Sequence, residues 1–330
     1  MKFGLFGGPR SDDETGAAYR AGYNAYFDLV VEAEALGYYS AFLVEHHFSG
    51  MRQVSSSLNV LGHLAALTST IRLGTAVVVL PWHNPILVAE QAATLDILSN
   101  GRFDFGVGRG YRNVEFEGFC IPIEEATERF EEAMQVIRAA FAADGRFSHH
   151  GKRWHYDNAV IEPKPLQQPH PPLWHAAGRP ESLKYTAEQG YNLFLDQFQT
   201  VDVILERLAI YQQAIADCGR EYDPLGVAVA RALHITRNDE EREAAIVERM
   251  KMLDAMNQYG RSRDGTQKSS MVSDDNLRIA SEESALMGTP DDIIARLLRM
   301  REAGVEYVLL TNATEEGLRT FSEEIMPAVA

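Results

Sequence analysis

The chain has 330 residues, of which 45% are hydrophobic and 24% are charged, and its formal net charge is −16. A net negative charge of this size argues against nucleic acid or an anionic membrane as a partner, so any bound anion needs a local basic site. Two cysteines are too few for a disulfide framework, the first residues lack the apolar segment of an export signal, and uninterrupted apolar runs fall short of the roughly 20 residues of a membrane span. We therefore expect a cytoplasmic protein.

In chain order, short apolar runs rich in β-branched residues alternate with longer segments of helical period. The predicted strands are 2–8, 39–45, 71–81, 102–108, 171–177, 191–196, 226–235 and 305–311. The predicted helices are 26–36, 56–69, 85–99, 124–142, 180–189, 201–215, an acidic one from 238 and a closing one after the last strand.

Eight strand–helix pairs predict a single α/β domain over 1–330, a (β/α)8 TIM barrel whose catalytic groups lie at the C-terminal ends of the strands. A doubly wound open sheet is the competing arrangement. Two segments interrupt the rhythm: 145–170 indicates a hairpin followed by a Pro-rich connection, and the polar stretch 258–286 predicts a long loop, either a lid or disordered.

The second predicted strand ends in Glu45-His46-His47. At the mouth of a barrel at least one imidazole can face a ligand, and histidine is the usual group for moving a proton near neutral pH. The alternative is that both histidines cap loop backbone. A metal site is not expected, because the chain has no HExxH helix and His149-His150 falls in the predicted hairpin away from any array of carboxylates.

The stretch 101–113, GRFDFGVGRGYRN, does not match the dinucleotide pattern GxGxxG, because Tyr111 stands at the third glycine position. What remains is a strand ending in Gly108 and Arg109, which suits a flat ligand and a fixed cation for a phosphate. The glycines could also simply open a turn.

The stretch 175–183, HAAGRPESL, follows a strand and opens a helix. Gly178 relaxes the turn, Arg179 adds a charge, and Ser182 and the free amides face any anion placed there. Together with Arg109 this predicts a monophosphate site, although an ordinary capped helix also explains the segment. In 73–85, the small residues up to Ala76 would let a planar ring lie against the backbone, whereas 77–80 indicate barrel core.

These motifs, in this order and spacing, resemble the bacterial luciferase-like flavin-dependent monooxygenases. The resemblance is carried by MKFGLF, EHHF, LGTAVVVLP, the pattern from Ala89 to Gly110 that ends in GRG, and MGTPDDIIARL. It implies a TIM barrel that binds reduced FMN, reacts it with O₂ and uses the flavin C4a-hydroperoxide to oxidise a small organic substrate such as an aldehyde or ketone.

The resemblance assigns residues one by one. His46 matches the catalytic histidine near the flavin, and Ala76-Val77 matches a non-prolyl cis peptide on which the flavin ring rests. Arg109 matches the arginine of the FMN phosphate, Ser182 matches a phosphate-binding hydroxyl, and Glu115 falls where the family often has an acid.

The chain also departs from the family pattern. Gly108 stands where luciferase α-chains have a reactive cysteine, and Gly178-Arg179 replaces an acid–serine pair in the second phosphate loop. We do not expect light emission. The polar stretch 258–286 falls roughly where luciferases have a mobile lid.

Two other functions stay open: an F420-dependent oxidoreductase on the same barrel, and a non-catalytic flavin-binding protein. Because a second nucleotide motif is lacking, we expect a separate reductase to supply FMNH₂, and the resemblance implies a homodimer through the helices at 56–69 and 85–99. The organic substrate is not identified by the aromatic residues that could line a pocket, since core packing explains each equally: Phe6, Trp82, Tyr111, Trp174 and Phe194.

Overall fold

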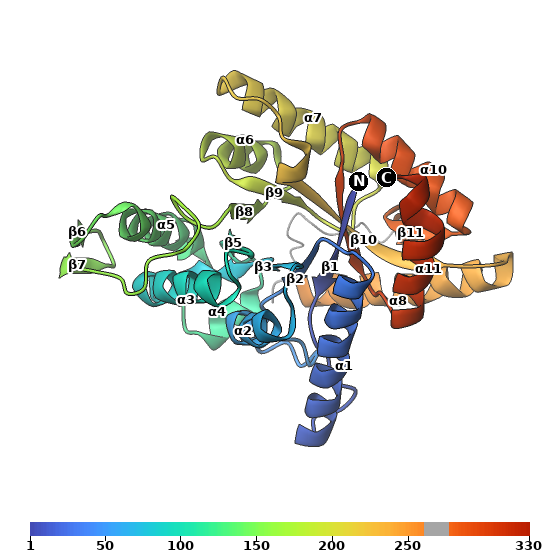
Figure 1. Cartoon of the computed structure of the whole chain (residues 1–330), viewed down its shortest axis with the longest axis horizontal. Helices are drawn as coiled ribbons and strands as arrows, with labels where there is room; N and C mark the ends of the chain where they lie inside the picture. Colours follow the sequence, from blue (N-terminus) through green and yellow to red (C-terminus); the bar gives the residue numbers. More distant parts are fainter. Residues whose placement is uncertain (261–276) are drawn as a thin grey trace. The chain divides into compact units, whose positions relative to one another are not determined.

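The chain folds as a closed parallel barrel of eight strands with flanking helices (Figure 1). The structure is a computed structural model that describes residues 1–260 and 277–330. The barrel strands are β1 (Lys2–Gly7), β2 (Ser40–Leu43), β3 (Arg72–Thr75), β5 (Phe103–Gly108), β8 (Leu173–Ala176), β9 (Asn192–Leu195), β10 (Val227–Ile235) and β12 (Tyr307–Thr311). They follow one another in this order around the sheet, with β12 between β1 and β10, and β10 closes on β9. The predicted TIM barrel is confirmed.

The helices follow the strands in the expected alternation. The longer ones are α1 (Gly16–Ala35), α2 (Ser57–Leu67), α3 (Pro85–Leu98), α5 (Ala126–Ala142), α6 (Pro180–Glu188), α7 (Val201–Asp217), α8 (Asp239–Gly260) and α10 (Pro290–Glu302). Short helices are α4 (Asn113–Gly118), α9 (Leu277–Glu283) and α11 (Glu315–Thr320). Side-chain caps fix several starts: Asn84 accepts from two amides at the first turn of α3, and Thr289 with Asp292 forms a capping box on α10.

The prediction of one continuous strand over 71–81 is wrong. This segment divides into β3, the short β4 (Val78–Val79) and a 3₁₀ turn over Leu80–Trp82. The break falls at the peptide bond between Ala76 and Val77, which is cis. After it, β4 pairs in parallel with the end of β5, so the chain rejoins the sheet.

The insertion at 145–170 has the predicted hairpin, whereas the insertion at 258–286 is only partly as predicted. Within 145–170, β6 (Phe147–His150) and β7 (His155–Ala159) form an antiparallel hairpin. Within 258–286, α9 and the start of β11 (Ala285–Gly288) replace the predicted loop, because Ala280, Ala285 and Leu286 are apolar residues that become buried. The rest of that predicted loop, 261–276, lies outside the described residues.

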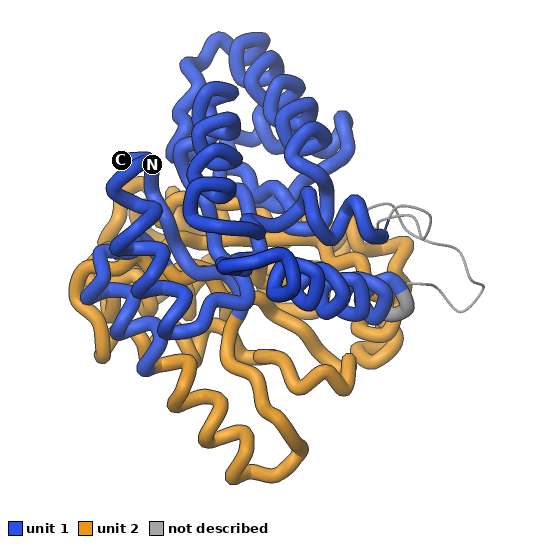
Figure 2. The backbone as a smooth tube through the Cα atoms, turned by 90° about the vertical axis from the view of Figure 1, so that its right-hand side faces the viewer, with its two compact units in different colours: residues 1–7, 28–40, 175–330 blue, residues 8–27, 41–174 orange. Residues whose placement is uncertain are grey.

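The chain divides into two compact units, which Figure 2 colours separately. Unit 1 comprises residues 1–7, 28–40 and 175–330, and unit 2 comprises residues 8–27 and 41–174. In unit 1 the core is built on β10 and β12, whose central residues are buried as expected for parallel strands covered on both faces. In unit 2 the core is built on β5, which is buried along its whole length.

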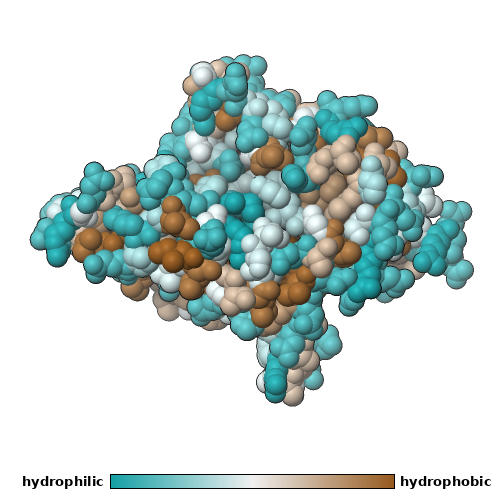
Figure 3. All heavy atoms as spheres, viewed as in Figure 1, coloured by the Kyte–Doolittle hydropathy of each residue, from teal (hydrophilic) through white to brown (hydrophobic). Residues whose placement is uncertain are grey.

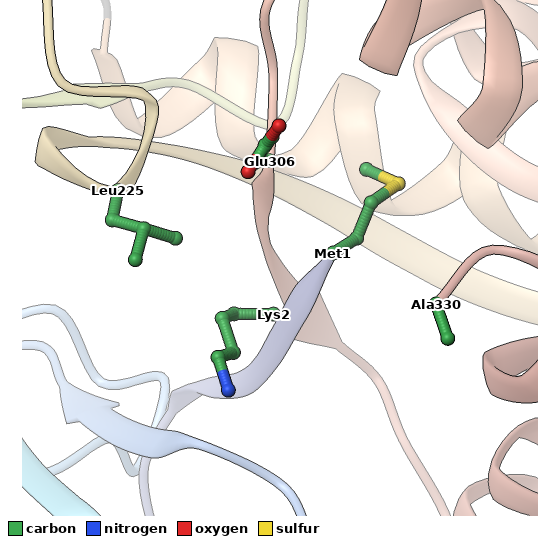
Figure 4. Close-up of a pocket in the computed structure, with 5 residues that line it drawn as sticks. All are labelled: Met1, Lys2, Leu225, Glu306 and Ala330. Carbon is green, nitrogen blue, oxygen red and sulfur yellow. The ribbon is translucent and has the colours of Figure 1, made fainter.

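A cavity of about 320 Å³ in unit 1 lies at the N-terminal end of β1 and beside the start of β12 (Figure 4). Met1, Lys2, Leu225, Glu306 and Ala330 line it. Because active sites of TIM barrels lie at the C-terminal ends of the strands, this cavity is at the wrong end of the barrel for catalysis.

Polar and apolar residues are interspersed on the face that Figure 3 shows. Among the described residues, none of the helices is long and apolar enough to cross a membrane.

Candidate active site

Glu45 is a buried carboxylate just after β2, and four N–H groups converge on it. Its Oε1 atom accepts a hydrogen bond from Trp82 Nε1 at 2.9 Å, and Oε2 accepts one from the Val79 amide at 3.3 Å. The same Oε1 lies 3.0 Å from His47 Nε2 and 2.7 Å from His83 Nε2. Since a carboxylate can only accept, both imidazoles present an N–H to it. Glu45 therefore ties the end of β2 to the segment that follows the cis peptide.

The hydrogen bonds decide the charge of this carboxylate. Burial raises the pKa of Glu45, but the hydrogen bonds from the two imidazoles and the indole lower it more, and together they hold the pKa at about 2. Glu45 is therefore ionised throughout the neutral range.

His46, the next residue, pairs with a different acid. Its Nδ1 lies 3.1 Å from Glu115 Oε1, and the same oxygen accepts the His47 amide at 3.0 Å. Glu115 lies on α4 and is 2% exposed, whereas the His46 side chain is 16% exposed. Because the carboxylate accepts at Nδ1, the proton of a neutral His46 is on Nδ1, and Nε2 is its proton-accepting atom.

Opposing influences set the pKa of His46. Burial, the largest of them, lowers this pKa below its ordinary value, and the charge of Arg112 also lowers it. The hydrogen bond to Glu115 and the charges of Glu115 and Glu45 raise the pKa, but the net shift is downward. At pH 7 His46 is therefore neutral, which suits a proton acceptor.

Arg112 itself is a buried cation, 2% exposed. Its Nε lies 3.4 Å from the Tyr111 hydroxyl, and its two terminal nitrogens have no hydrogen-bond partner among the described residues. Sequence reasoning missed Arg112, because nothing in GRGYRN distinguishes it from the exposed Arg109.

An aromatic cluster packs beside these groups. The Trp82 ring stacks on Phe119 with centroids 5.1 Å apart and meets Phe116 edge-on at 5.2 Å. The His47 ring meets Phe119 edge-on at 4.9 Å. Trp82 is thus held by one stacked ring, by edge-on ring contacts and through its N–H, which makes it part of the framework that holds Glu45.

The predicted ring-binding segment lies on β3–β4. Ala76 and Val77 are half-buried, while Thr75 and Val78 on either side of them are buried. A Cβ atom on Gly108 would lie 2.4 Å from Val77 Cγ2, so only glycine lets β5 approach the cis peptide this closely. Arg109 is exposed, and its Nη1 donates to the Thr127 hydroxyl at 3.1 Å.

The second predicted phosphate loop, in unit 1, precedes α6. Arg179 is exposed at the N-cap position, Pro180 is the first helical residue and Ser182 is half-buried in the first turn. A Cβ atom on Gly178 would lie 2.9 Å from Arg207 Nη1, so Arg207 of α7 packs directly against this loop. Sequence reasoning noted only the apolar face of that helix and missed Arg207.

The aromatic residues considered as pocket lining divide into two groups. Trp174 is buried and donates to Asp104 at 3.2 Å, and Phe194 is also buried, so both belong to the core. Phe6 is half-buried and Tyr111 is 44% exposed.

The luciferase-like monooxygenase family matches residues 1–307 of the chain. This protein belongs to the luciferase-like monooxygenase family. It is therefore an enzyme of the oxidoreductase class, and the relatives that it matches include a component of a flavin-dependent monooxygenase.

Two relatives show the range of similarity. The chain is 30% identical to the uncharacterized protein y4vJ of Sinorhizobium fredii, over 82% of this chain and 79% of that protein. It is 28% identical to the oxygenase component of the flavin-dependent trigonelline monooxygenase of Acinetobacter baylyi, over 68% of this chain and 62% of that protein. The match thus spans less than two thirds of the length of the trigonelline enzyme component.

Solved structures share the fold. The monooxygenase RslO1 from Streptomyces bottropensis superposes with a TM-score of 0.85 at 23% identity, over the full length of both chains. An F420-dependent secondary alcohol dehydrogenase superposes with a TM-score of 0.75 at 18% identity, also over both full lengths. At these identities the likeness shows the barrel alone.

The Glu45 network predicts a specific response of this luciferase-like monooxygenase to acid. The drop of the Glu45 pKa from 4.5 to about 2 corresponds to about 3 kcal/mol of stability. Because the folded-state pKa is lowered, that contribution is complete above pH 4.5 and is lost as the pH falls toward 2. We expect Glu45→Gln to be less stable than the wild type by about this amount at pH 7, and the difference to narrow at pH 3.

Urea denaturation at pH 7 and pH 3 measures the difference in the free energy of unfolding between the wild type and Glu45→Gln. Glu124→Gln, at an exposed glutamate, is the matched control. An equal difference at both pH values would contradict the assignment.

Proposed function

We propose that this protein is an FMN-dependent monooxygenase in which reduced FMN and O₂ form a flavin C4a-hydroperoxide that oxidises a small organic substrate. The observation that carries the proposal is the His46 imidazole, which Glu115 orients directly after Glu45, the residue whose carboxylate binds the segment that follows the cis peptide. The similarity to a flavin-dependent monooxygenase component supports it.

The residues around the cis peptide fit a flavin ring. The half-buried Ala76-Val77 segment has buried neighbours on both sides, and Gly108 leaves no side chain between β5 and Val77. We propose that the ring lies against Ala76 and Val77, that Gly108 allows the close approach, and that the exposed Arg109 binds the phosphate. We also propose that Gly178, Arg179 and Ser182 form a second phosphate-binding element.

The chemistry divides between the cofactor and the chain. Bound reduced flavin supplies the electrons that activate O₂. His46 controls the proton: its Nε2 accepts a proton from, or hydrogen-bonds to, the reacting oxygen or the substrate, while Glu115 holds Nδ1. Burial, with a smaller contribution from the charge of Arg112, keeps this imidazole neutral, and the aromatic side chains of Trp82 and Phe116 pack beside this group of residues.

Several features of the proposal concern partners. We propose that a separate reductase supplies FMNH₂ and that 1–330 acts as a single cytoplasmic domain. We also propose a homodimer through α2 and α3, since both helices expose large apolar side chains: Leu67, Leu87, Ile97 and Leu98, each at least 45% exposed.

The role of His46 is tested by His46→Asn. We expect FMN affinity within about twofold of the wild type, because the imidazole is assigned to proton control, and a decay of the flavin hydroperoxide at least about tenfold faster. Rapid mixing of the FMNH₂ complex with oxygenated buffer measures that decay. In the wild type the decay should accelerate only below pH 6.5, because the lowered pKa of His46 keeps it neutral above that value. His155→Asn on the exposed hairpin is the control, and an unchanged decay in His46→Asn would refute the role.

The cofactor assignment is tested by Arg109→Met. A charge-assisted contact to the phosphate predicts at least about tenfold weaker binding of FMN and unchanged binding of riboflavin, which lacks the phosphate. Titration of both flavins measures this, with Arg146→Met on β6's flanking turn as control. Tighter binding of F420 than of FMN by the wild type would replace the monooxygenase with an F420-dependent oxidoreductase.

The dimer is tested by Leu98→Glu, which places a charge on an apolar side chain that is 60% exposed. Light scattering should give a dimer for the wild type and a monomer for the variant. Ile279→Glu, at an isoleucine that is 53% exposed on α9 and so outside α2 and α3, should stay dimeric. A monomeric wild type would contradict the proposal.

A further inference from the structure

Two buried arginines in unit 1 contact the residues that follow the C-terminal end of β9. Arg231, on β10, has no exposed surface, and Arg249, on α8, is 1% exposed. Both are held by main-chain oxygens just beyond β9: Arg231 by Asp196 and Arg249 by Gln197. Neither forms an ion pair with a carboxylate among the described residues.

One edge of the Arg231 guanidinium is unused. Its Nη1 donates to the carbonyls of Asp196 at 2.9 Å and Ala230 at 3.0 Å. Its Nε and Nη2 are buried and have no hydrogen-bond partner within the described chain. These two nitrogens carry parallel N–H bonds on the same side of the guanidinium. In this arrangement they can donate to both oxygens of one carboxylate.

Arg249 also has two unused nitrogens, although they do not share one edge of its guanidinium. Its Nη2 donates to the Gln197 carbonyl and to the Ser284 hydroxyl, each at 2.7 Å, while its Nε and Nη1 lack partners in the part of the chain that the structure describes. His234, at the end of β10, also has a buried Nε2 with no partner there.

The charges around this cluster are not balanced. Arg231 experiences the positive charges of Arg249, Arg296 and Arg207 and the negative charge of Asp196, which forms an ion pair with Arg207. Burial, the largest influence, lowers the pKa of Arg231 to about 9 and that of Arg249 to about 10, so both remain charged at neutral pH.

His234 does not compensate these cations. Burial, followed by the charge of Arg249, lowers the pKa of His234 to about 4. It is therefore neutral at pH 7. Buried cations that form no ion pair are costly, and the two arginines form none among the described residues although the chain has a net charge of −16. The excess of cations here therefore points to an anion that comes from outside.

We propose that Arg231, Arg249 and His234 bind the carboxylate of an organic acid, with the free edge of Arg231 as the bidentate contact. Resting on the proposed function, this makes the oxidised substrate an organic anion rather than a neutral aldehyde or ketone. The proposal concerns the carboxylate group of this acid and assigns no residues to its apolar part.

Isothermal titration calorimetry of the FMN-loaded protein tests the proposal, with benzoate as the probe and benzamide as its uncharged match. We expect benzoate to bind, benzamide to bind at least about tenfold more weakly, and Arg231→Met or Arg249→Met to weaken benzoate binding by about 30-fold or more. The control is Arg237→Met, which removes the same charge from the exposed loop after β10 and should bind benzoate like the wild type.

Thermal denaturation without ligand separates a binding role from a structural one. Removing an uncompensated buried cation should leave the melting temperature of Arg231→Met unchanged or higher, and benzoate should raise the melting temperature of the wild type only. A lower melting temperature with unchanged benzoate binding would overturn the proposal, as would equal binding of benzoate and benzamide. Binding of inorganic phosphate in place of benzoate, with the same dependence on Arg231, would also overturn it.

The monooxygenase proposal and the anion-site proposal would fail with different experimental results. FMN binding and hydroperoxide formation without carboxylate binding would refute the anion site and leave the monooxygenase. Carboxylate binding that depends on Arg231, in a protein that does not bind FMN, would refute the monooxygenase and leave the anion site.

Discussion

The convergence of four N–H groups on the buried carboxylate of Glu45 is the interaction on which the candidate active site depends. The carboxylate joins the end of β2 to the residues after the cis peptide, through Val79, Trp82 and His83. Without its charge, the partly exposed imidazoles of His47 and His83 and the indole of Trp82 would lose a charged acceptor. The connection ties the residue that precedes His46 to the segment that follows the cis peptide.

Two neighbouring acids thus have different tasks because their surroundings differ. Glu45 receives every donor within reach and stays ionised, which makes it a structural anchor. Glu115 has one imidazole and one amide as partners and orients His46. The imidazole in turn stays neutral because burial and Arg112 outweigh Glu115. A neutral base next to a fixed cation suits chemistry in which the timing of a proton transfer decides between product and hydrogen peroxide.

The sequence was sufficient to predict the barrel and the position of the cis peptide. Alternating periodicity located eight strands, since each is a buried apolar run between turn residues, and the family resemblance located the cis peptide and Glu115. β11 and α9 were missed because they are short and lie in a stretch dominated by polar residues.

The buried and half-buried arginines could not be found from one sequence. Arg112, Arg207 and Arg231 are spread over the chain, and arginine is usually an exposed residue, so local pattern favours a solvated position for each. Only tertiary structure shows that Arg231 is enclosed on a barrel strand and that Arg207 packs on the loop at Gly178. The local excess of positive charge around Arg231, in a chain that is acidic overall, arises only when the chain folds.

The most direct test of the account is rapid mixing of the purified protein, loaded with photoreduced FMN, against oxygenated buffer, with the absorbance of the flavin hydroperoxide and the released hydrogen peroxide followed together. The account predicts a long-lived intermediate that members of a panel of aldehydes, ketones and carboxylic acids discharge faster. Immediate reoxidation to FMN and hydrogen peroxide without an intermediate would contradict it.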